Sequence, residues 1–122
     1  NTNGTAAIQG ITIRDDLFDR YRGSEDFIQK YIFPGGFLPS IHFMKNLMKK
    51  NNLNLLKINS YPDDYAKTLA IWRENFFKTW DNISPLGFDE TFKRMWEFYL
   101  SYCEAGFKAR NINLIQCSMS NK

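Results

Sequence analysis

The sequence predicts an α/β protein, and three observations support this fold class. Three stretches have the alternating or β-branched apolar pattern of strands. Two long stretches carry an apolar residue at every third or fourth position, which is the helical period. The composition, with 43% apolar and 16% aromatic residues, is too rich in core-forming side chains for a disordered chain. A chain of 122 residues can bury one core, so we expect a single domain at most.

The N-terminal part of the chain predicts a strand followed by a helix. Residues 6–13 alternate loosely around isoleucines and predict a mostly buried strand. Apolar positions over 17–31 fit a helix that Asp15 or Asp16 would cap and that Gly23 weakens. The proline–glycine turn that follows ends this helix.

The middle of the chain predicts a short amphipathic helix and a second strand. Ser40 is placed to cap this helix, and Asn51 and Asn52 close it. A second strand is expected over 53–58. The helix would turn three apolar residues inward and three lysines outward, namely Phe43, Leu47 and Met48 against Lys45, Lys49 and Lys50.

The two long amphipathic stretches predict long helices. The first begins at Pro62 and the second is capped by Asp89, and a final strand is expected over 112–119. The apolar stripe of the first is Tyr65, Leu69, Trp72, Phe76 and Trp80, and that of the second is Phe92, Met95, Trp96, Tyr99, Cys103 and Phe107. The three strands alternate with pairs of helices, which is expected of one flank of a larger sheet.

Composition and motifs exclude several classes of protein. The sequence has no apolar run near 18 residues and no basic signal segment, so we expect a cytoplasmic protein without a spanning helix. The net charge of +3 is scattered, which argues against nucleic-acid binding. Cys103 and Cys117 lack zinc-ligand spacing and are interpreted as packed thiols, and no metal site is expected.

Two further features suggest an incomplete enzyme. The sequence contains no glycine-rich phosphate-binding loop, so the nucleotide-binding half of a larger fold is not expected here. The chain also begins without methionine and passes quickly into an apolar run, which suggests a fragment.

Four blocks of sequence, in order, point to one family. They read YIFPGGFLPS at 31–40, YAKTLAIW at 65–72, GFDE at 87–90 and RMWEFYLSYCEAGF at 94–107. Together they resemble the motifs of cyclopropane-fatty-acyl-phospholipid synthases, and the likeness covers nearly the whole chain. The resemblance implies that residues 1–122 are the C-terminal segment of a Rossmann-like class I methyltransferase domain. This segment would contain three strands, the last of them antiparallel, and about four helices. It also implies that the half binding S-adenosylmethionine is missing.

The resemblance implies a reaction and a candidate site. These enzymes transfer the methyl group of S-adenosylmethionine to a cis double bond of a phospholipid acyl chain, and a base then removes a proton to close the ring. That base is thought to be a bound bicarbonate ion. The motifs place Tyr65 as its catalytic hydroxyl donor and Ile11 beside it, with Gln9 where the family has histidine. Glutamine can donate to an oxyanion but cannot titrate.

The resemblance also implies an acyl channel and partners. The walls of this channel would suit an apolar acyl chain, and the faces of their aromatic rings would stabilise a transient cation. The expected channel residues are Phe33, Leu69, Trp72, Phe76, Trp96 and Tyr99. The expected partners are unsaturated phospholipid acyl chains at the inner face of the membrane, which the protein would contact peripherally through the lysines of residues 45–50. A second copy of the full-length protein is also expected as a partner, in a homodimer. Alone, the chain should be inactive.

Other interpretations stay open. The protein could use another methyl acceptor, such as a methyl-branched acyl chain or an amine, or it could bind a lipid or a partner without catalysis. Tyr65 could be a core tyrosine. The aromatic stripes are interpreted first as packing of the core and only second as walls of the channel. Glu104 is expected on the polar side of its helix, solvated or paired with Lys108, and His42 is expected at the surface.

Overall fold

The computed structural model describes residues 4–121 and contains a three-stranded sheet in the order β1–β3–β2. The strands are β1 (Thr5–Ile13), β2 (Leu53–Ser60) and β3 (Ile112–Asn121). β3 pairs antiparallel with both neighbours, so β1 and β2 run parallel to each other on either side of it. The predicted strands, and an antiparallel last strand inserted beside the first, are therefore confirmed.

The burial of the strands follows from this order. β3 has neighbours on both edges, and its residues Leu114, Ile115 and Cys117 are buried. The first five residues of β1 are exposed, and burial is reached only at Thr12 and Ile13. The expectation of a mostly buried first strand is thus wrong for its first half, because within residues 4–121 no strand pairs with its outer edge.

The segment after β1 is broken where a continuous helix was expected. It forms η1 (Asp15–Leu17), α1 (Phe18–Arg22) and, after a gap, the π-type turn η2 (Ile28–Ile32). The helix ends at Gly23, which has little preference for helical geometry. The expected aspartate cap is also wrong: Asp15 instead accepts a hydrogen bond from the backbone N–H of His42 at 2.9 Å.

Helix α2 (Ile41–Lys50) begins as predicted, because Ser40 Oγ accepts a hydrogen bond from the Phe43 N–H at 3.2 Å. Met48 is buried against β2 and β3, as expected. Leu47 was expected to face inward, but it is 45% exposed. His42 and the three lysines of this helix are exposed, as predicted.

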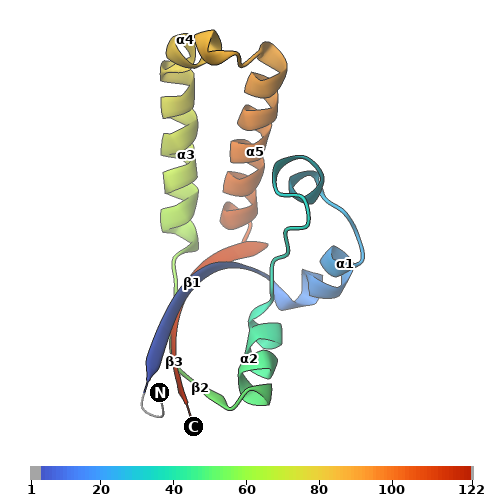
Figure 1. Ribbon diagram of the computed structural model, residues 1–122, viewed down its shortest axis with the longest axis vertical. Coiled ribbons are helices and arrows are strands. Elements are labelled where there is room, and N and C mark those ends of the chain that lie inside the picture. Colours follow the sequence, from blue (N-terminus) through green and yellow to red (C-terminus); the bar gives the residue numbers. More distant parts are fainter. Residues whose placement is uncertain (1–3, 122) are drawn as a thin grey trace.

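Helices α3 (Pro62–Lys78) and α5 (Glu90–Lys108) form an antiparallel hairpin. Figure 1 shows this hairpin projecting from the sheet, with α4 (Trp80–Ile83) at its tip, followed by η3 (Ser84–Leu86). The predicted cap of the second long helix is confirmed, since Asp89 accepts from the Phe92 N–H at 2.8 Å. Gly87 turns the chain there with φ of 100°, a conformation that favours glycine.

The main core lies where the hairpin meets the sheet. Its buried members come from α3, α5 and β3: Ala66, Leu69, Leu100, Cys103, Phe107 and Leu114. A second cluster on the opposite face of the sheet joins α2 to β3 through Met48, Cys117 and Met119. Both cysteines are free and buried, which confirms the interpretation as packed thiols.

Candidate functional site

A cavity of about 270 Å³ lies at the base of the hairpin. It is bounded by β1, by residues 26–38 and by α3 and α5. Its walls are largely apolar or aromatic and include Ile11, Phe33, Tyr65, Leu69, Tyr99 and Phe107. Five of the residues expected from the sequence are therefore brought together here, which makes this cavity the candidate site.

Tyr65 reaches the cavity from the first turn of α3. Pro62 occupies the start of this helix, and the carboxylates of Asp63 and Asp64 favour its N-terminus. The Tyr65 ring centroid lies 4.9 Å from that of Phe107. Burial raises the pKa of the Tyr65 hydroxyl, with a smaller contribution from nearby Cys103, so this group is a protonated hydrogen-bond donor at neutral pH.

Tyr99 provides a second phenol on the facing helix. Burial, helped by the neighbouring Cys103 and Tyr65, raises the pKa of Tyr99 to about 12. Burial likewise raises the pKa of the Cys103 thiol to about 11, so it remains a thiol and not a reactive thiolate. The cavity thus offers two phenols among aromatic faces, together with the Asp26 side chain, whose oxygens accept from the Gln29 N–H and the Tyr102 hydroxyl.

The segment from Asp26 to Leu38 closes one side of the cavity, and three internal hydrogen bonds hold it in place. Asp26 N–H donates to Gln29 Oε1 at 3.0 Å, while Gln29 N–H donates to Asp26 Oδ1 at 2.9 Å. Gln29 Nε2 also donates to the Gly36 carbonyl at 3.2 Å. This reciprocal pair has the spacing of a capping box, a signal in the sequence that could have located these residues.

The two glycines of this segment meet different backbone requirements. Gly35 has φ of +77°, in the left-handed region. A Cβ atom on Gly36 would lie 2.9 Å from the Phe33 carbonyl oxygen, closer than such atoms approach. The tight turn that results carries Phe33 and Phe37 to the cavity wall.

Gln9 does not reach this cavity. It lines a separate and more open groove on the sheet, of about 400 Å³, together with Lys57, Asn59 and Gln116. Its side-chain oxygen accepts a hydrogen bond from Gln116 Nε2 at 2.8 Å, from the residue paired with it across the two strands. We assign the site to the smaller cavity because it is the more enclosed and apolar of the two.

Three of the expected channel residues lie elsewhere on the hairpin. Trp72 is 48% exposed and contacts Tyr65 edge-on, with 6.0 Å between ring centroids. Phe76 and Trp96 are half-buried farther along α3 and α5, in contact with the ring of Phe92. The contact of Phe76 with Phe92 joins α3 to α5, whereas Trp96 stacks on Phe92 within α5, and both rings pack against the hairpin core.

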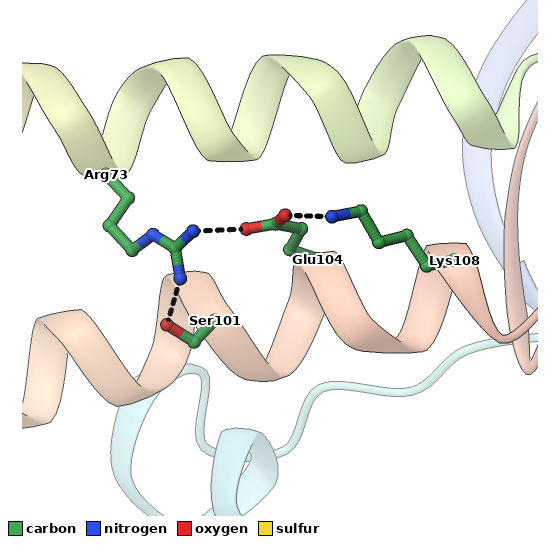
Figure 2. A network of polar contacts seen from close by, with 4 residues as sticks. All are labelled: Arg73, Ser101, Glu104 and Lys108. Atoms are coloured by element: carbon green, nitrogen blue, oxygen red, sulfur yellow. Dashed lines mark hydrogen bonds and ion pairs between the residues drawn. The ribbon is translucent and has the colours of Figure 1, made fainter.

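A polar network fixes the two helices beside the site. Glu104 is only 6% exposed, although it was expected on the polar side of α5, because α3 covers that face. Its Oε1 lies 2.5 Å from Lys108 Nζ, which confirms the expected alternative that Glu104 pairs with Lys108. Its Oε2 lies 2.9 Å from Arg73 Nη2, an ion pair in which the N–H is not aligned as a hydrogen bond. Arg73 also donates to Ser101 Oγ at 2.8 Å (Figure 2).

The part of the chain that the structure describes lacks a metal-binding cluster and a membrane-spanning helix. Residues 4–121 contain no cluster of histidine, cysteine or acidic side chains that could hold a metal ion. In the same part of the chain, no helix is long and apolar enough to cross a membrane.

The fold identifies a class of protein. An antiparallel last strand between two parallel strands, with helices on both faces, is the arrangement of the C-terminal portion of the Rossmann-like class I methyltransferase fold. A solved structure of mycolic acid cyclopropane synthase CmaA1 complexed with SAH and CTAB superposes with a TM-score of 0.85 and 25% identity. The match covers all of this chain and 45% of that one.

The chain belongs to the mycolic acid cyclopropane synthetase family, whose model matches residues 1–117. It is 41% identical over 117 residues to the tuberculostearic acid methyltransferase UfaA1 of Mycobacterium tuberculosis, covering 95% of this chain and 27% of that protein. It is 35% identical over 96 residues to the cyclopropane-fatty-acyl-phospholipid synthase of Escherichia coli, covering 79% and 25%. The chain thus spans about a quarter of the length of these relatives.

Proposed function

We propose that this chain forms the acyl-binding portion of an S-adenosylmethionine-dependent methyltransferase that alkylates the cis double bond of a phospholipid acyl chain. The observation that carries the proposal is the enclosed apolar cavity with two protonated phenols, in a chain of this family. The walls are mostly apolar, and the oxygens of their one carboxylate, Asp26, already accept from the Gln29 N–H and the Tyr102 hydroxyl, so the cavity suits an alkyl chain better than a charged acceptor such as an amine.

The residues of this chain would serve the acceptor and not the cofactor. S-adenosylmethionine supplies the methyl group in such reactions. The sequence has no glycine-rich loop of the kind that binds such a cofactor, so we assign cofactor binding to a part of the enzyme outside this chain. The relatives are about four times as long as the matched segment, which leaves room for such a part.

The cavity walls would favour the reaction in two ways. Apolar walls exclude water, which would otherwise capture a cation formed at the double bond. The ring faces of Tyr65, Tyr99 and Phe107 can stabilise that cation through their quadrupoles. Loss of a proton from it to a base would then close the three-membered ring.

The proposed bicarbonate base fits this chain only in part. Tyr65 presents a hydroxyl donor to the cavity, and Ile11 lines the same wall. Gln9 lies outside, with its side-chain oxygen already engaged by Gln116. We therefore propose Tyr65, with the backbone near Ile11, as this chain's contribution to holding the ion.

The experiment is expression of the gene that encodes this chain in cells fed methyl-labelled methionine, followed by mass spectrometry of their phospholipids. We expect a labelled one-carbon gain on unsaturated acyl chains, and we expect the isolated 122-residue chain to transfer no label. Absence of label from lipid, with the expressed protein binding S-adenosylmethionine, would contradict the proposal and indicate another acceptor.

A second candidate is formation of a methyl-branched acyl chain, in which the cation loses a proton from a neighbouring carbon and forms a carbon–carbon double bond in place of the ring. The higher identity to the tuberculostearic acid methyltransferase than to the cyclopropane synthase favours it. Proton NMR of the labelled lipid separates the two products, because a cyclopropane methylene and a branched methyl group resonate at different positions. A third candidate, lipid or partner binding without catalysis, predicts no label at all.

A further inference from the structure

Residues 22–36, here called the lid, form a loop beside α5 that covers one side of the cavity (Figure 1). The two ends of the lid are tied together. The Leu38 N–H donates to the Tyr21 hydroxyl at 3.1 Å, and the Tyr21 ring centroid lies 6.1 Å from that of Phe37. A compact surface loop whose ends lie close together is an Ω-loop, and such loops are frequently functional. The lid is therefore a unit that joins the rest of the chain through a narrow base.

The base of the lid is firmly anchored, whereas the lid itself is not. Phe18 and Ser40, which flank it in the sequence, are buried, and the Phe37 ring centroid lies 5.7 Å from that of Phe18. By contrast, no residue of the lid is buried. In residues 4–121, no backbone–backbone hydrogen bond joins the lid to the sheet or to α5. Segments with few buried contacts open locally at a small cost in free energy, so the lid can open while its base stays in place.

Two contacts near the surface hold the lid against α5. The Phe27 ring meets Phe98 edge-on, with 4.7 Å between ring centroids, and Phe98 is 52% exposed. The Tyr102 hydroxyl donates to Asp26 Oδ2 at 3.4 Å, which is long for an O–H···O hydrogen bond, usually about 2.5–3.0 Å. These two contacts, here called the latch, are weak enough to break and re-form without unfolding the hairpin.

The other apolar contacts of the lid lie at the cavity itself. Ile28 packs against the hairpin core, and the Phe33 ring centroid lies 6.1 Å from that of Tyr99. All three residues line the cavity. An alkyl chain in the cavity would therefore contact the inner side of the lid, and this contact would favour the closed position.

We propose that the lid opens away from α5 to admit an acyl chain and then closes over it. The proposal rests on the function proposed above, in which the substrate is a phospholipid acyl chain. The cavity of about 270 Å³ is smaller than the roughly 300–1,000 Å³ of ordinary ligand pockets, so a long alkyl chain needs more room than the closed lid leaves. Gly23 and Gly36 lie at the two ends of the lid, where glycine can absorb large changes in the backbone angles. Closure excludes water from the reacting double bond.

The test measures how fast Cys103 becomes accessible in the complete protein encoded by the gene. Cys103 is buried and lines the cavity that the lid covers. Cys117, buried in the cluster under α2, is the control thiol, because only a wider unfolding exposes it. The protein is treated with N-ethylmaleimide, and peptide mass spectrometry follows the labelling of each thiol. Labelling follows the population of the open form when closing is fast, and submicellar oleate should slow it at Cys103.

Weakening the latch should speed the labelling of Cys103. Phe27→Ala and Phe98→Ala each remove one ring of the same pair and should raise the rate about two- to tenfold, while the double variant should gain little more. Phe88→Ala is the matched control, since it removes a ring that lies 4.5 Å from Phe92 near the hairpin tip and should leave the Cys103 rate unchanged. An unchanged rate in both latch variants would overturn the proposal. An equal rise at the control thiol would also overturn it, because the labelling would then report global unfolding.

Failure here can be told from failure of the proposed function, because labelling of Cys103 needs neither S-adenosylmethionine nor methyl transfer. A protein that alkylates phospholipid acyl chains but labels Cys103 equally fast with and without the latch would contradict the lid alone. A protein whose labelling depends on the latch and is slowed by oleate, but which transfers no methyl group to lipid, would contradict the proposed function alone. Failure of oleate to slow the labelling would contradict both, since an acyl chain would then not occupy the cavity.

Discussion

The two faces of the sheet are packed with different kinds of side chain. The hairpin face combines a mostly aliphatic buried core with the aromatic rings of Tyr65, Tyr99 and Phe107, which line a cavity of about 270 Å³. The α2 face is built from methionine and cysteine, with Met48 and Met119 closing over Cys117. Flexible thioether side chains fill irregular space, whereas planar rings held by their neighbours leave a shaped gap. The comparison teaches that the site lies on the face that carries the large planar side chains.

The largest expected effect comes from the most buried ring of the hairpin face. Phe107 is completely buried, so Phe107→Ala should destabilise the protein by about 3–5 kcal/mol through lost burial and an enlarged cavity. Met48→Ala on the α2 face should cost less, about 2–3 kcal/mol, because its flexible neighbours can collapse. Urea unfolding of both variants measures the difference. Equal losses of stability in the two variants would contradict the expected difference between the two faces of the sheet.

The next effect is on chemistry. Tyr65→Phe should leave S-adenosylmethionine affinity unchanged and slow turnover about a hundredfold, because a single donor to the reacting region is lost. Single-turnover label transfer by the complete protein measures this. Tyr21→Phe, which removes a hydroxyl that accepts from the Leu38 N–H at the same cavity, is the matched control for structure. Unchanged turnover in the Tyr65 variant would restrict its role to packing.

The ion-pair network on the hairpin should matter less than the rings. Glu104→Gln removes a buried carboxylate from two cations and should cost about 1–3 kcal/mol. Glu74→Gln breaks an exposed pair with Lys78 and should change the stability by less than about 0.5 kcal/mol. Thermal unfolding of both variants tests this. A loss at Glu74 as large as that at Glu104 would show that burial is not the cause.

The contribution of the hairpin face to the stability of the protein should also fall at alkaline pH. The pKa of Tyr99 rises from 10.0 to about 12 on folding, so its contribution to stability is fully present below pH 10 and is lost as the pH rises toward 12. Urea midpoints measured across this range should fall, and Tyr99→Phe should reduce the slope. An identical slope in that variant would assign the alkaline loss to other groups, such as the Cys103 thiol.

A small effect is expected at Trp72, the exposed middle member of the aromatic stripe of α3. The regular spacing of the stripe predicts a cost of a few kcal/mol for Trp72→Ala. The structure revises this to about 1 kcal/mol or less, because Trp72 is 48% exposed. Differential scanning calorimetry checks the revision. A large fall in melting temperature would show that this ring is covered in solution.

The sequence was sufficient to predict the strands, the hairpin helices and the two side-chain caps at Ser40 and Asp89. These features depend on local periodicity and on short hydrogen bonds within one turn. It could not predict that Leu47 and Trp72 are exposed, since periodicity marks an apolar stripe without saying how much of it another element covers.

The site was predictable to the extent that motif positions coincide with the cavity. Tyr65, Ile11 and Tyr99 meet there from three separate elements, and the family resemblance singled them out. The closing segment was missed because its apolar spacing resembles a continuous helix, while the Asp26–Gln29 hydrogen bonds start a new turn. The burial of Glu104 was missed because it depends on α3, which lies 31 residues from it at Arg73.

The central position of β3 has a consequence for how the chain folds. β1 and β2 never pair with each other, and each depends on a strand that is synthesised after both. The Gln9–Gln116 contact spans 107 residues, so β3 can pair with β1 only after almost all of this segment has emerged from the ribosome. Until then β1 and β2 each lack the edge partner that they share within residues 4–121, and an unpaired strand edge favours aggregation.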